Sequence, residues 1–299
     1  MSLLITGGTG FVGKALVKRL GDEPMRLANR ADFSDWPKVL VGVSTVVHLA
    51  ARVHVMQDNA ADPLAAFRAV NVGCTLSLAR QSAATGVKRF VFISSVKVNG
   101  ESTFPGQPFT PDDAPAPLDA YAVSKMEAEQ GLRTIASNTG MEVVIIRPPL
   151  VYGLGVKANF DAMLRGLASG IPLPLGAISN RRSLVGLDNL ADLIVTCLTH
   201  PAAANQTFLV SDGEDVSTTE LLRRMGKALG RPARLIPVPA NWLKLVAAIV
   251  GKQDVAQRLC ASLQVDIEKT RRLLGWRPPL TLDQGLKKAA ERYVRETGV

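Results

Sequence analysis

The sequence has few cysteines, few histidines and few aromatic residues, and these shortages exclude several classes of protein. Its three cysteines, Cys74, Cys197 and Cys260, are odd in number and lie far apart. This spacing indicates neither a disulfide framework nor a zinc site, and we interpret the thiols as small buried hydrophobic groups. Aromatic residues make up 5% of the chain, which is too few for a surface that stacks nucleic-acid bases. We therefore expect no metal ion and no nucleic acid as partners.

The chain also lacks a long hydrophobic run and a secretion signal. Its longest apolar stretch, residues 242–250, contains Lys244 and is much shorter than the roughly 20 residues that span a bilayer. We interpret this stretch as a packed helix, with peripheral membrane contact as the alternative. The chain does not open with a basic segment followed by an apolar one, so we expect a cytoplasmic protein with no integral membrane segment. Without a GxSxG motif, hydrolase chemistry has no support.

Acidic residues are outnumbered by basic ones. The 299 residues include 26 Asp and Glu against 35 Lys and Arg, which gives a formal net charge of +9. Because the basic residues are scattered along the chain, the charge favours small anionic ligands over a nucleic-acid surface. The length allows one large domain or two smaller ones with a full hydrophobic core.

Short apolar runs alternate with helical patterns over the first half of the chain. The runs cover residues 2–6, 25–28, 45–49, 89–94 and 142–147, and the helical patterns cover 13–20, 62–85 and 120–139. This alternation predicts an α/β fold with a doubly wound parallel sheet, the Rossmann fold. Later helical patterns, at 188–198, 217–229, 241–263 and 282–296, predict a smaller mixed α/β C-terminal region. We divide the chain into 1–150 and 151–299 and expect strands and helices to be exchanged between the two parts.

Four glycines follow the first predicted strand in the segment TGGTGFVG. They are Gly7, Gly8, Gly10 and Gly13. Glycine at these positions permits a tight turn, a close approach of backbone amides to a pyrophosphate, and close packing of a helix on a sheet. The segment therefore predicts a dinucleotide-binding site.

The end of the second predicted strand bears on which dinucleotide binds. It carries Asn29 and Arg30, where an NAD site usually has an acid that binds the ribose hydroxyls. Arginine suits a 2′-phosphate, so we expect an NAD(P) site that favours NADP(H) slightly over NAD(H). Asp32 lies close enough to leave NAD open.

Tyr121 and Lys125 form a YxxxK pattern at the start of a predicted helix. Their spacing of four places the phenol and the ammonium on one helical face. A cation beside a phenol lowers its pKa toward neutrality, so that the hydroxyl can exchange a proton. Ser94 and Ser95 end a buried strand upstream, at the edge where parallel sheets bind ligands. The combination predicts a proton-transfer site.

These motifs, together with VVHLAA, NVGCT, FISSVKVNG, RPPLVYG and RRSLVGLDNLAD, make the chain resemble the extended short-chain dehydrogenase/reductases over nearly its whole length. This superfamily includes the NAD-dependent epimerase/dehydratase family. The resemblance implies that Ser95 polarises the substrate oxygen, Tyr121 exchanges the proton, and Lys125 holds the nicotinamide ribose. The cofactor contacts that we expect are Gly7, Thr9, Gly10, Phe11, Val12, Gly13, Asn29, Arg30, Leu49, Ala50, Ala51, Asn71, Tyr121, Lys125 and Pro148. The expected substrate contacts are Ser95, Lys97, Tyr121, Asn159 and Arg182.

The histidines carry less of the expected chemistry. We interpret His48 as a hydrogen-bonded support residue on a buried strand, and His200 as structural. Arg52 and His54 are weak candidates for substrate contact, because they follow the strand edge near the expected sugar site.

Departures from the family pattern narrow the expected activity. Val96 and Lys97 follow Ser95, where the family's dehydratases carry an acid pair, so a 4,6-dehydratase is not expected. Asn99 precedes Gly100, where the family's epimerases usually have tyrosine, which speaks against epimerisation without excluding it.

The whole pattern most resembles bacterial enzymes that reduce a nucleotide-linked 4-keto sugar. Our main hypothesis is NAD(P)H-dependent reduction of UDP-4-keto-6-deoxy-N-acetylglucosamine to UDP-N-acetylquinovosamine, in surface polysaccharide biosynthesis. The alternatives are a UDP-hexose 4-epimerase that retains NAD, and a catalytically inactive cofactor-binding regulator. The resemblance also implies a homodimer through the helices at 65–85 and 120–139.

Overall fold

The computed structural model describes residues 2–28, 36–53, 62–104, 106–153, 155 and 159–297. Four residues named from the sequence lie outside these ranges. They are Asn29, Arg30 and Asp32, which bear on the choice of cofactor, and His54, a candidate for substrate contact. The roles expected of these four stay predictions.

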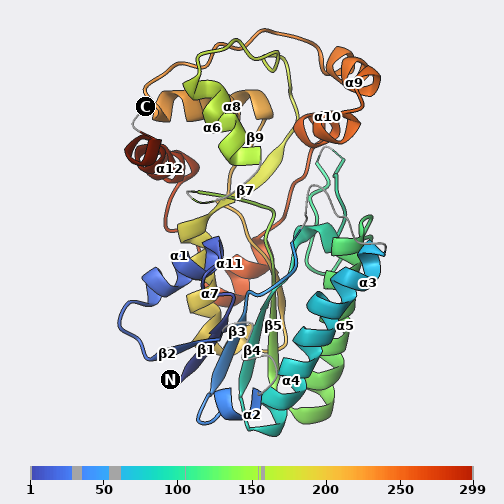
Figure 1. Cartoon of the computed structure of the whole chain (residues 1–299), viewed down its shortest axis with the longest axis vertical. Helices are drawn as coiled ribbons and strands as arrows, with labels where there is room; N and C mark the ends of the chain where they lie inside the picture. The colour runs from blue at the N-terminus through green and yellow to red at the C-terminus, as the bar shows by residue number, and fades with distance from the viewer. Residues whose placement is uncertain are drawn as a thin grey trace.

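A parallel sheet of six strands forms the larger layer (Figure 1). In spatial order its strands are β2 (Met25–Ala28), β1 (Leu3–Thr6), β3 (Thr45–His48), β4 (Arg89–Ile93), β5 (Glu142–Arg147) and β8 (Thr207–Leu209). Every neighbouring pair is parallel. The carboxyl ends of all six strands therefore meet at one edge, where such sheets bind their ligands.

Helices cover both faces of this sheet (Figure 1). One face carries α1 (Phe11–Leu20), α7 (Leu187–Thr199) and α11 (Glu268–Leu274), and the other carries α2 (Trp36–Val39), α4 (Thr75–Ala84) and α5 (Ala120–Thr139). Alternate residues of β1 serve the two faces: Leu3 and Ile5 share a core with Leu16, whereas Leu4 shares a core with Leu78. The predicted doubly wound α/β fold is confirmed.

The helix expected over residues 62–85 is divided into three parts. α3 (Pro63–Phe67) is followed by a π-helical segment, Arg68–Cys74, and then by α4. The wider turns of a π-helix are rare and recur at functional sites. Here the segment carries Asn71, whose side chain is 1% exposed.

A second, smaller sheet lies in the C-terminal region. Its strands β6 (Leu150–Tyr152) and β7 (Arg182–Gly186) are parallel, and β9 (Asp215–Val216) runs antiparallel to β7. The helices of this region are α6 (Asn159–Ala168), α8 (Thr218–Ala228), α9 (Ala240–Ile249), α10 (Gln253–Cys260) and α12 (Leu282–Thr297). The expected mixed α/β region is confirmed, but the single helix expected over 241–263 is broken near Gly251, which has a φ of +67°. None of the helices in the described ranges is long and apolar enough to cross a bilayer.

Some elements that come late in the chain lie with the large sheet. β8 follows the first strands of the small sheet in the chain, yet it pairs with β5 of the large sheet. α7 likewise packs beside α1. The division of the chain at residue 150 stays a prediction.

All three cysteines are free thiols. Cys197, a residue of α7, is fully buried in the core, as expected. Cys74 and Cys260 are only partly buried, because they lie at the ends of helical segments near the surface.

A buried ion pair links α5 to β5. Arg147 Nη2 lies 2.6 Å from Glu129 Oε2, and the two side chains are 2% and 1% exposed. Glu129 Oε1 also accepts a hydrogen bond from Ser94 Oγ at 2.6 Å. Arg147 Nη1 donates to Asn99 Oδ1 at 3.0 Å, and Asn99 Nδ2 donates to the carbonyl of Thr110. This network fastens the ends of β4 and β5 to α5.

We predict that Glu129→Gln lowers the free energy of unfolding by about 3–5 kcal/mol, because it leaves the Arg147 guanidinium buried without a counter-charge. Chemical denaturation measures this change. Asp112→Asn is the matched control, since Asp112 is 74% exposed in its ion pair with Lys269; its effect should stay below about 1 kcal/mol. Equal effects of the two substitutions would contradict the structural role of the buried pair.

Candidate active site

The glycine loop between β1 and α1 is packed too closely to accept side chains. Gly7 has a φ of +73°, and a Cβ at this position would lie 2.7 Å from the backbone nitrogen of Ala50. A Cβ at Gly13 would lie 2.3 Å from the carbonyl oxygen of Gly7. The backbone N–H of Gly10 donates to the same oxygen at 3.0 Å. The turn therefore brings the start of α1 against the ends of β1 and β3.

The N-terminus of α1 is suited to an anion. Gly10 is the N-cap, no described side chain caps the helix, and its first turn contains no acidic residue. The first N–H groups of a helix lack intrahelical partners and carry partial positive charge. Phe11 and Val12 lie in this turn and keep part of their surface exposed. A pyrophosphate fits this cradle, so the loop can hold a dinucleotide.

Leu49 and Ala51 flank the residue that Gly7 approaches, and both keep part of their surface exposed. They leave the sheet at the carboxyl end of β3, directly beside the glycine loop. Their expected contact with the cofactor agrees with this placement and stays a prediction. Thr9, also expected at the cofactor, is an exposed residue of the loop itself.

The segment that follows β4 is held by backbone hydrogen bonds to the end of β5. The N–H of Ser94 donates to Ile146 O at 2.8 Å, and the N–H of Val96 donates to Pro148 O at 3.0 Å. Ser95 lies between these two anchors, and its Oγ accepts the N–H of Lys97 at 3.2 Å. Ser95 and Pro148 therefore meet at the carboxyl edge of the sheet.

Tyr121 lies in the first turn of α5, which Asp119 caps by accepting the N–H of Ala122 at 2.7 Å. The phenol is hydrogen-bonded to the side chain of Ser95. Burial raises the pKa of Tyr121 to about 12, against the lowering effect of the Ser95 hydrogen bond, and the Asp119 charge raises it further. The structure thus brings together the two groups that the sequence assigned to one substrate oxygen.

Lys125 lies one turn further along α5 and is 2% exposed. Its Nζ donates to Ile93 O at 2.7 Å and lies 4.1 Å from the centre of the Phe92 ring. Burial lowers the pKa of Lys125 to about 7, although the Glu129 charge raises it. The expected lowering of the Tyr121 pKa by Lys125 is not found, because the ammonium is bound at the end of β4 and burial dominates the titration of the phenol.

Phe67 borders Tyr121, and Arg52 lies against Phe67. The Phe67 ring meets the Tyr121 ring edge-on, with 6.0 Å between centroids. The Arg52 guanidinium lies 5.4 Å from the centre of Phe67. The sequence named Arg52 only as a weak candidate and missed Phe67, since a phenylalanine in a helical pattern indicates core packing alone.

Comparisons with known proteins identify the family of this chain. A model of the NAD dependent epimerase/dehydratase family matches residues 3–211. The chain belongs to this family, within the extended short-chain dehydrogenase/reductases. The resemblance inferred from the motifs is confirmed.

Relatives of this epimerase/dehydratase chain differ in what their names say they do. A UDP-glucose 4-epimerase of Vibrio cholerae is 49% identical over 314 residues, which cover 98% of this chain and 96% of that protein. A dTDP-4-dehydro-6-deoxyglucose reductase of Escherichia coli is 24% identical, with 96% of this chain and 95% of that protein covered. The chain is therefore a member of a family of nucleotide-sugar epimerases and reductases.

Solved structures share the fold over the full length. RMD from Pseudomonas aeruginosa, in complex with NADPH, has a TM-score of 0.78 at 23% identity and covers 98% of this chain and 99% of that chain. A UDP-glucuronic acid 4-epimerase from Bacillus cereus, in complex with NAD, has a TM-score of 0.77 at 20% identity, with 99% of each chain covered. These likenesses support the fold of the epimerase/dehydratase chain.

Asn71 supports the site through protein groups. Its Nδ2 donates to Arg52 O at 3.0 Å and to Ser124 Oγ at 2.9 Å, and its Oδ1 accepts the N–H of Arg52 at 2.8 Å. The amide thus joins the segment after β3 to α5, next to Lys125. In the structure Asn71 positions the walls of the cofactor cradle, and its direct contact with a cofactor stays a prediction.

His48 is enclosed beneath the cradle. Its Nδ1 lies 2.6 Å from Thr6 Oγ1 and its Nε2 lies 2.8 Å from Thr75 Oγ1. Burial, assisted by the Lys125 charge, lowers the pKa of His48 to about 3. The ring is therefore neutral at physiological pH, in agreement with the support role expected from the sequence.

Three residues, Lys97, Arg182 and Asn159, are expected to contact the substrate alone. Lys97 Nζ forms ion pairs with Asp119 Oδ2 at 2.5 Å and with Glu101 Oε1 at 2.9 Å. Arg182 Nη1 donates to two carbonyl oxygens at the end of α10, those of Arg258 and Ala261. Asn159 begins α6, and its side chain lies outside the described part of the structure. Their contacts with substrate stay predictions.

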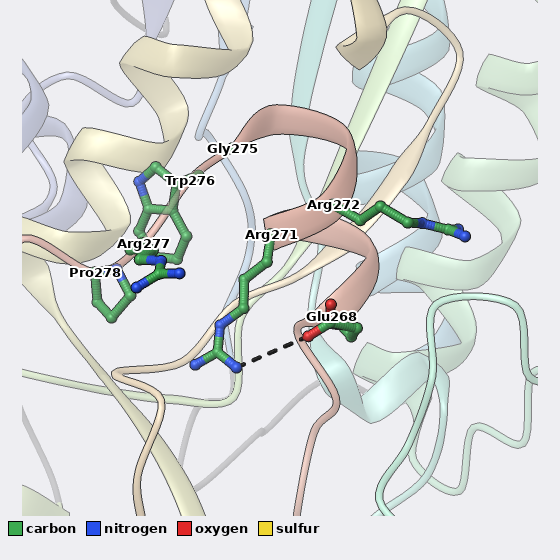
Figure 2. A pocket seen from close by; sticks show the side chains of 7 residues that line it. All are labelled: Glu268, Arg271, Arg272, Gly275, Trp276, Arg277 and Pro278. Atoms are coloured by element: carbon green, nitrogen blue, oxygen red, sulfur yellow. Dashed lines mark ion pairs between the residues drawn. The ribbon is translucent and has the colours of Figure 1, made fainter.

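A hollow of about 720 Å³ lies elsewhere, around α11 (Figure 2). Its lining residues are Glu268, Arg271, Arg272, Gly275, Trp276, Arg277 and Pro278. None of the predicted site residues is among them. The candidate active site is therefore defined by its side-chain contacts and not by this hollow.

We predict that Gly13→Ala weakens dinucleotide binding roughly tenfold or more, which corresponds to about 1.4 kcal/mol, because the new methyl would collide with Gly7 O. Isothermal titration with NAD and NADP measures the affinity, and circular dichroism checks the fold. Gly166→Ala is the control, since the nearest atom to its Cβ, in Leu173, is 3.7 Å away. Unchanged affinity in a folded Gly13→Ala protein would contradict the proposed cradle.

We also predict that the protein loses stability as the pH falls from 6.5 toward 3. The pKa of His48 is lower in the folded protein than its ordinary value of 6.5, so the unfolded state binds more protons in this interval and gains stability from acidification. Denaturant unfolding at several pH values measures this slope. His48→Gln should make the slope shallower; an identical slope would show that His48 does not titrate in this way.

Proposed function

We propose that the protein is a UDP-hexose 4-epimerase that oxidises C4 of a UDP-linked sugar and reduces it again from the opposite side. The observation that carries this proposal is the 49% identity, over nearly the full length, to a protein named UDP-glucose 4-epimerase. The hydrogen-bonded pair of Ser95 and Tyr121 supports it, because it offers a proton-transfer group beside the cofactor cradle.

This proposal replaces the 4-keto reductase as the preferred activity. The sequence favoured the reductase because its whole motif pattern resembles such enzymes, and because Asn99 stands where family epimerases usually have tyrosine. In the structure Asn99 is 2% exposed and bonded to Arg147 and Thr110, so it belongs to the buried network and does not discriminate between the two reactions. The reductase among the relatives is only 24% identical.

The chain's own residues would divide the work at the sugar oxygen. Tyr121 Oη takes the proton from the 4-hydroxyl as the C–H bond at C4 breaks, and it returns that proton when the 4-keto group is reduced. Ser95 Oγ, which is bonded to the same phenol, orients the oxygen during both steps. A bound nicotinamide would supply the acceptor and donor of hydride. Epimerisation further requires the keto sugar to turn between the two hydride transfers.

Proton removal requires a phenolate, and the protein must therefore lower the pKa of Tyr121 from about 12. Lys125 is placed to help, because it lies one turn away on the same helix and its pKa of about 7 leaves it partly protonated at neutral pH. An ammonium that approaches the phenol favours the phenolate. We infer that the hydrogen bond to Ile93 O keeps the Lys125 ammonium close enough to Tyr121 to favour the phenolate.

We propose NAD as the retained cofactor. The family description names NAD, and an epimerase must keep the same nicotinamide through both hydride transfers. The residues that would hold it are the glycine loop and residues 49–51. The slight preference for NADP(H) depends on Arg30, which lies outside the described residues.

We predict that Tyr121→Phe lowers kcat by roughly 10²–10⁴-fold, which is the usual contribution of a positioned acid–base group, and leaves dinucleotide affinity within about threefold. Steady-state conversion of UDP-glucose to UDP-galactose measures kcat. Tyr293→Phe removes a hydroxyl from α12, outside the site, and should leave kcat unchanged. Full activity of Tyr121→Phe would show that Tyr121 does not transfer the proton, whereas no turnover by the parent protein would support the inactive alternative, in which the fold binds a cofactor without catalysis.

One assay separates the epimerase from the reductase. The protein is incubated with UDP-glucose without added cofactor, and in parallel with UDP-4-keto-6-deoxy-N-acetylglucosamine and NADPH or NADH. We expect UDP-galactose in the first reaction, no loss of nicotinamide absorbance in the second, and NAD released when the protein is denatured. Consumption of NADPH or NADH without conversion of UDP-glucose would instead establish the reductase.

A further inference from the structure

Helix α9 presents an apolar stripe to solvent. Trp242, Leu245, Val246 and Ile249 are 62%, 54%, 54% and 77% exposed. Their positions i, i+3, i+4 and i+7 lie on one face of the helix. Such a stripe usually faces a protein core, yet none of the residues of α9 is buried.

The opposite side of α9 is the side that packs against the rest of the protein. Leu243 and Ala247 are partly buried, and α9 packs against α10. Val250 and Val255, which are 59% and 50% exposed, extend the apolar surface into α10. Figure 1 shows α9 and α10 together at the margin of the C-terminal region, away from the large sheet. A contiguous exposed apolar surface of this kind indicates an interaction site.

Basic residues outnumber acidic ones in the segment that forms this surface, where Asp254 of α10 is the one acid among residues 225–260. Residues 225–253 contain Lys227, Arg231, Arg234, Lys244 and Lys252 and no aspartate or glutamate. A helix with Trp and aliphatic residues on one face and lysines nearby is typical of segments that lie in the interface of an anionic bilayer. The length of α9, ten residues, suits a helix lying on a bilayer and is too short for one that crosses it.

We propose that α9 and α10 form a docking surface for an anionic lipid bilayer. The apolar stripe of α9 enters the headgroup region, and the cations of residues 225–253 bind the lipid phosphates. A second copy of the chain is a poorer partner, because a two-fold interface would bring the same cationic segment of both copies together.

This surface is fastened to the candidate active site. Asn180 Nδ2 donates to Leu259 O at 3.1 Å and to Ala261 O at 2.8 Å. Arg182 Nη1 also bonds to Ala261 O, at 3.0 Å. Arg182 is the first residue of β7 and an expected substrate contact, and Asn180 lies two residues before it. Docking through α9 and α10 therefore holds the substrate side of the protein at the membrane surface.

Tryptophan fluorescence tests the proposal directly. Trp36 and Trp276 are 2% and 5% exposed, so of the three tryptophans Trp242 alone is exposed. Vesicles of phosphatidylcholine mixed with phosphatidylglycerol should shift the emission of the full-length protein to shorter wavelength. Vesicles of phosphatidylcholine alone should give a smaller shift, and high salt should reduce the effect. An unshifted spectrum with the anionic vesicles would overturn the proposal.

Vesicle flotation with variants locates the contact. Ile249→Ser combined with Leu245→Ser should reduce binding to the anionic vesicles roughly tenfold or more. Val41→Ser is the matched control, because Val41 is 65% exposed but follows α2, and its binding should equal that of the parent. Binding that survives the double substitution would refute docking through α9. A dimer that the double substitution dissociates, without vesicle binding by the parent, would assign the surface to a second copy.

Epimerase activity on a soluble UDP-sugar should be unchanged in the Ile249→Ser and Leu245→Ser protein, since neither residue belongs to the candidate site. The membrane proposal is therefore tested independently of the proposed function.

Discussion

A buried charge pair sets the geometry on which the candidate site depends. Glu129 and Arg147 are shielded from water, and separating two such charges is costly, so they tolerate little relative movement. Through Ser94 and Asn99 they hold the end of β4 and the segment after it against α5. Ser95 follows Ser94 directly, and Tyr121 lies about two turns before Glu129 on α5. The buried network of Glu129 and Arg147 therefore fixes the positions of the segments that carry Ser95 and Tyr121.

Much of the large sheet could be predicted because its signals are local. Residues 143–146 of β5 form a continuous apolar run. The bounds of α5 agree with the expected 120–139, since Asp119 caps one end and Gly140 ends the other with a φ of +75°. The π-helical segment could not be predicted, because the apolar period runs through residues 62–85 without a break, and Asn71 within the segment bonds to residues distant in sequence. The break near Gly251 was missed because the apolar period continues beyond it.

Some features of the candidate site could be predicted from the sequence and others could not. The glycine pattern after the first strand predicted the close turn, and the family resemblance, not the spacing, assigned Ser95 and Tyr121 to one site. Spacing could not predict the direction of the Tyr121 pKa, because it places Lys125 on a helical face but says nothing about solvent. Two expected substrate cations, Lys97 and Arg182, are engaged by protein oxygens. A bound substrate would compete with these protein oxygens for the two cations. A sequence pattern does not show which partner binds more strongly.

The placement of β8 has a consequence for how the chain can fold. Residues 207–209 complete the large sheet beside β5, although strands β6 and β7 and helix α6 of the small region precede them in the chain. Until those residues leave the ribosome, β5 is an edge strand with unpaired backbone groups, and such an edge can pair with another chain. The cofactor region therefore cannot be completed as an independent unit during synthesis. Its last strand arrives only after part of the C-terminal region has been made.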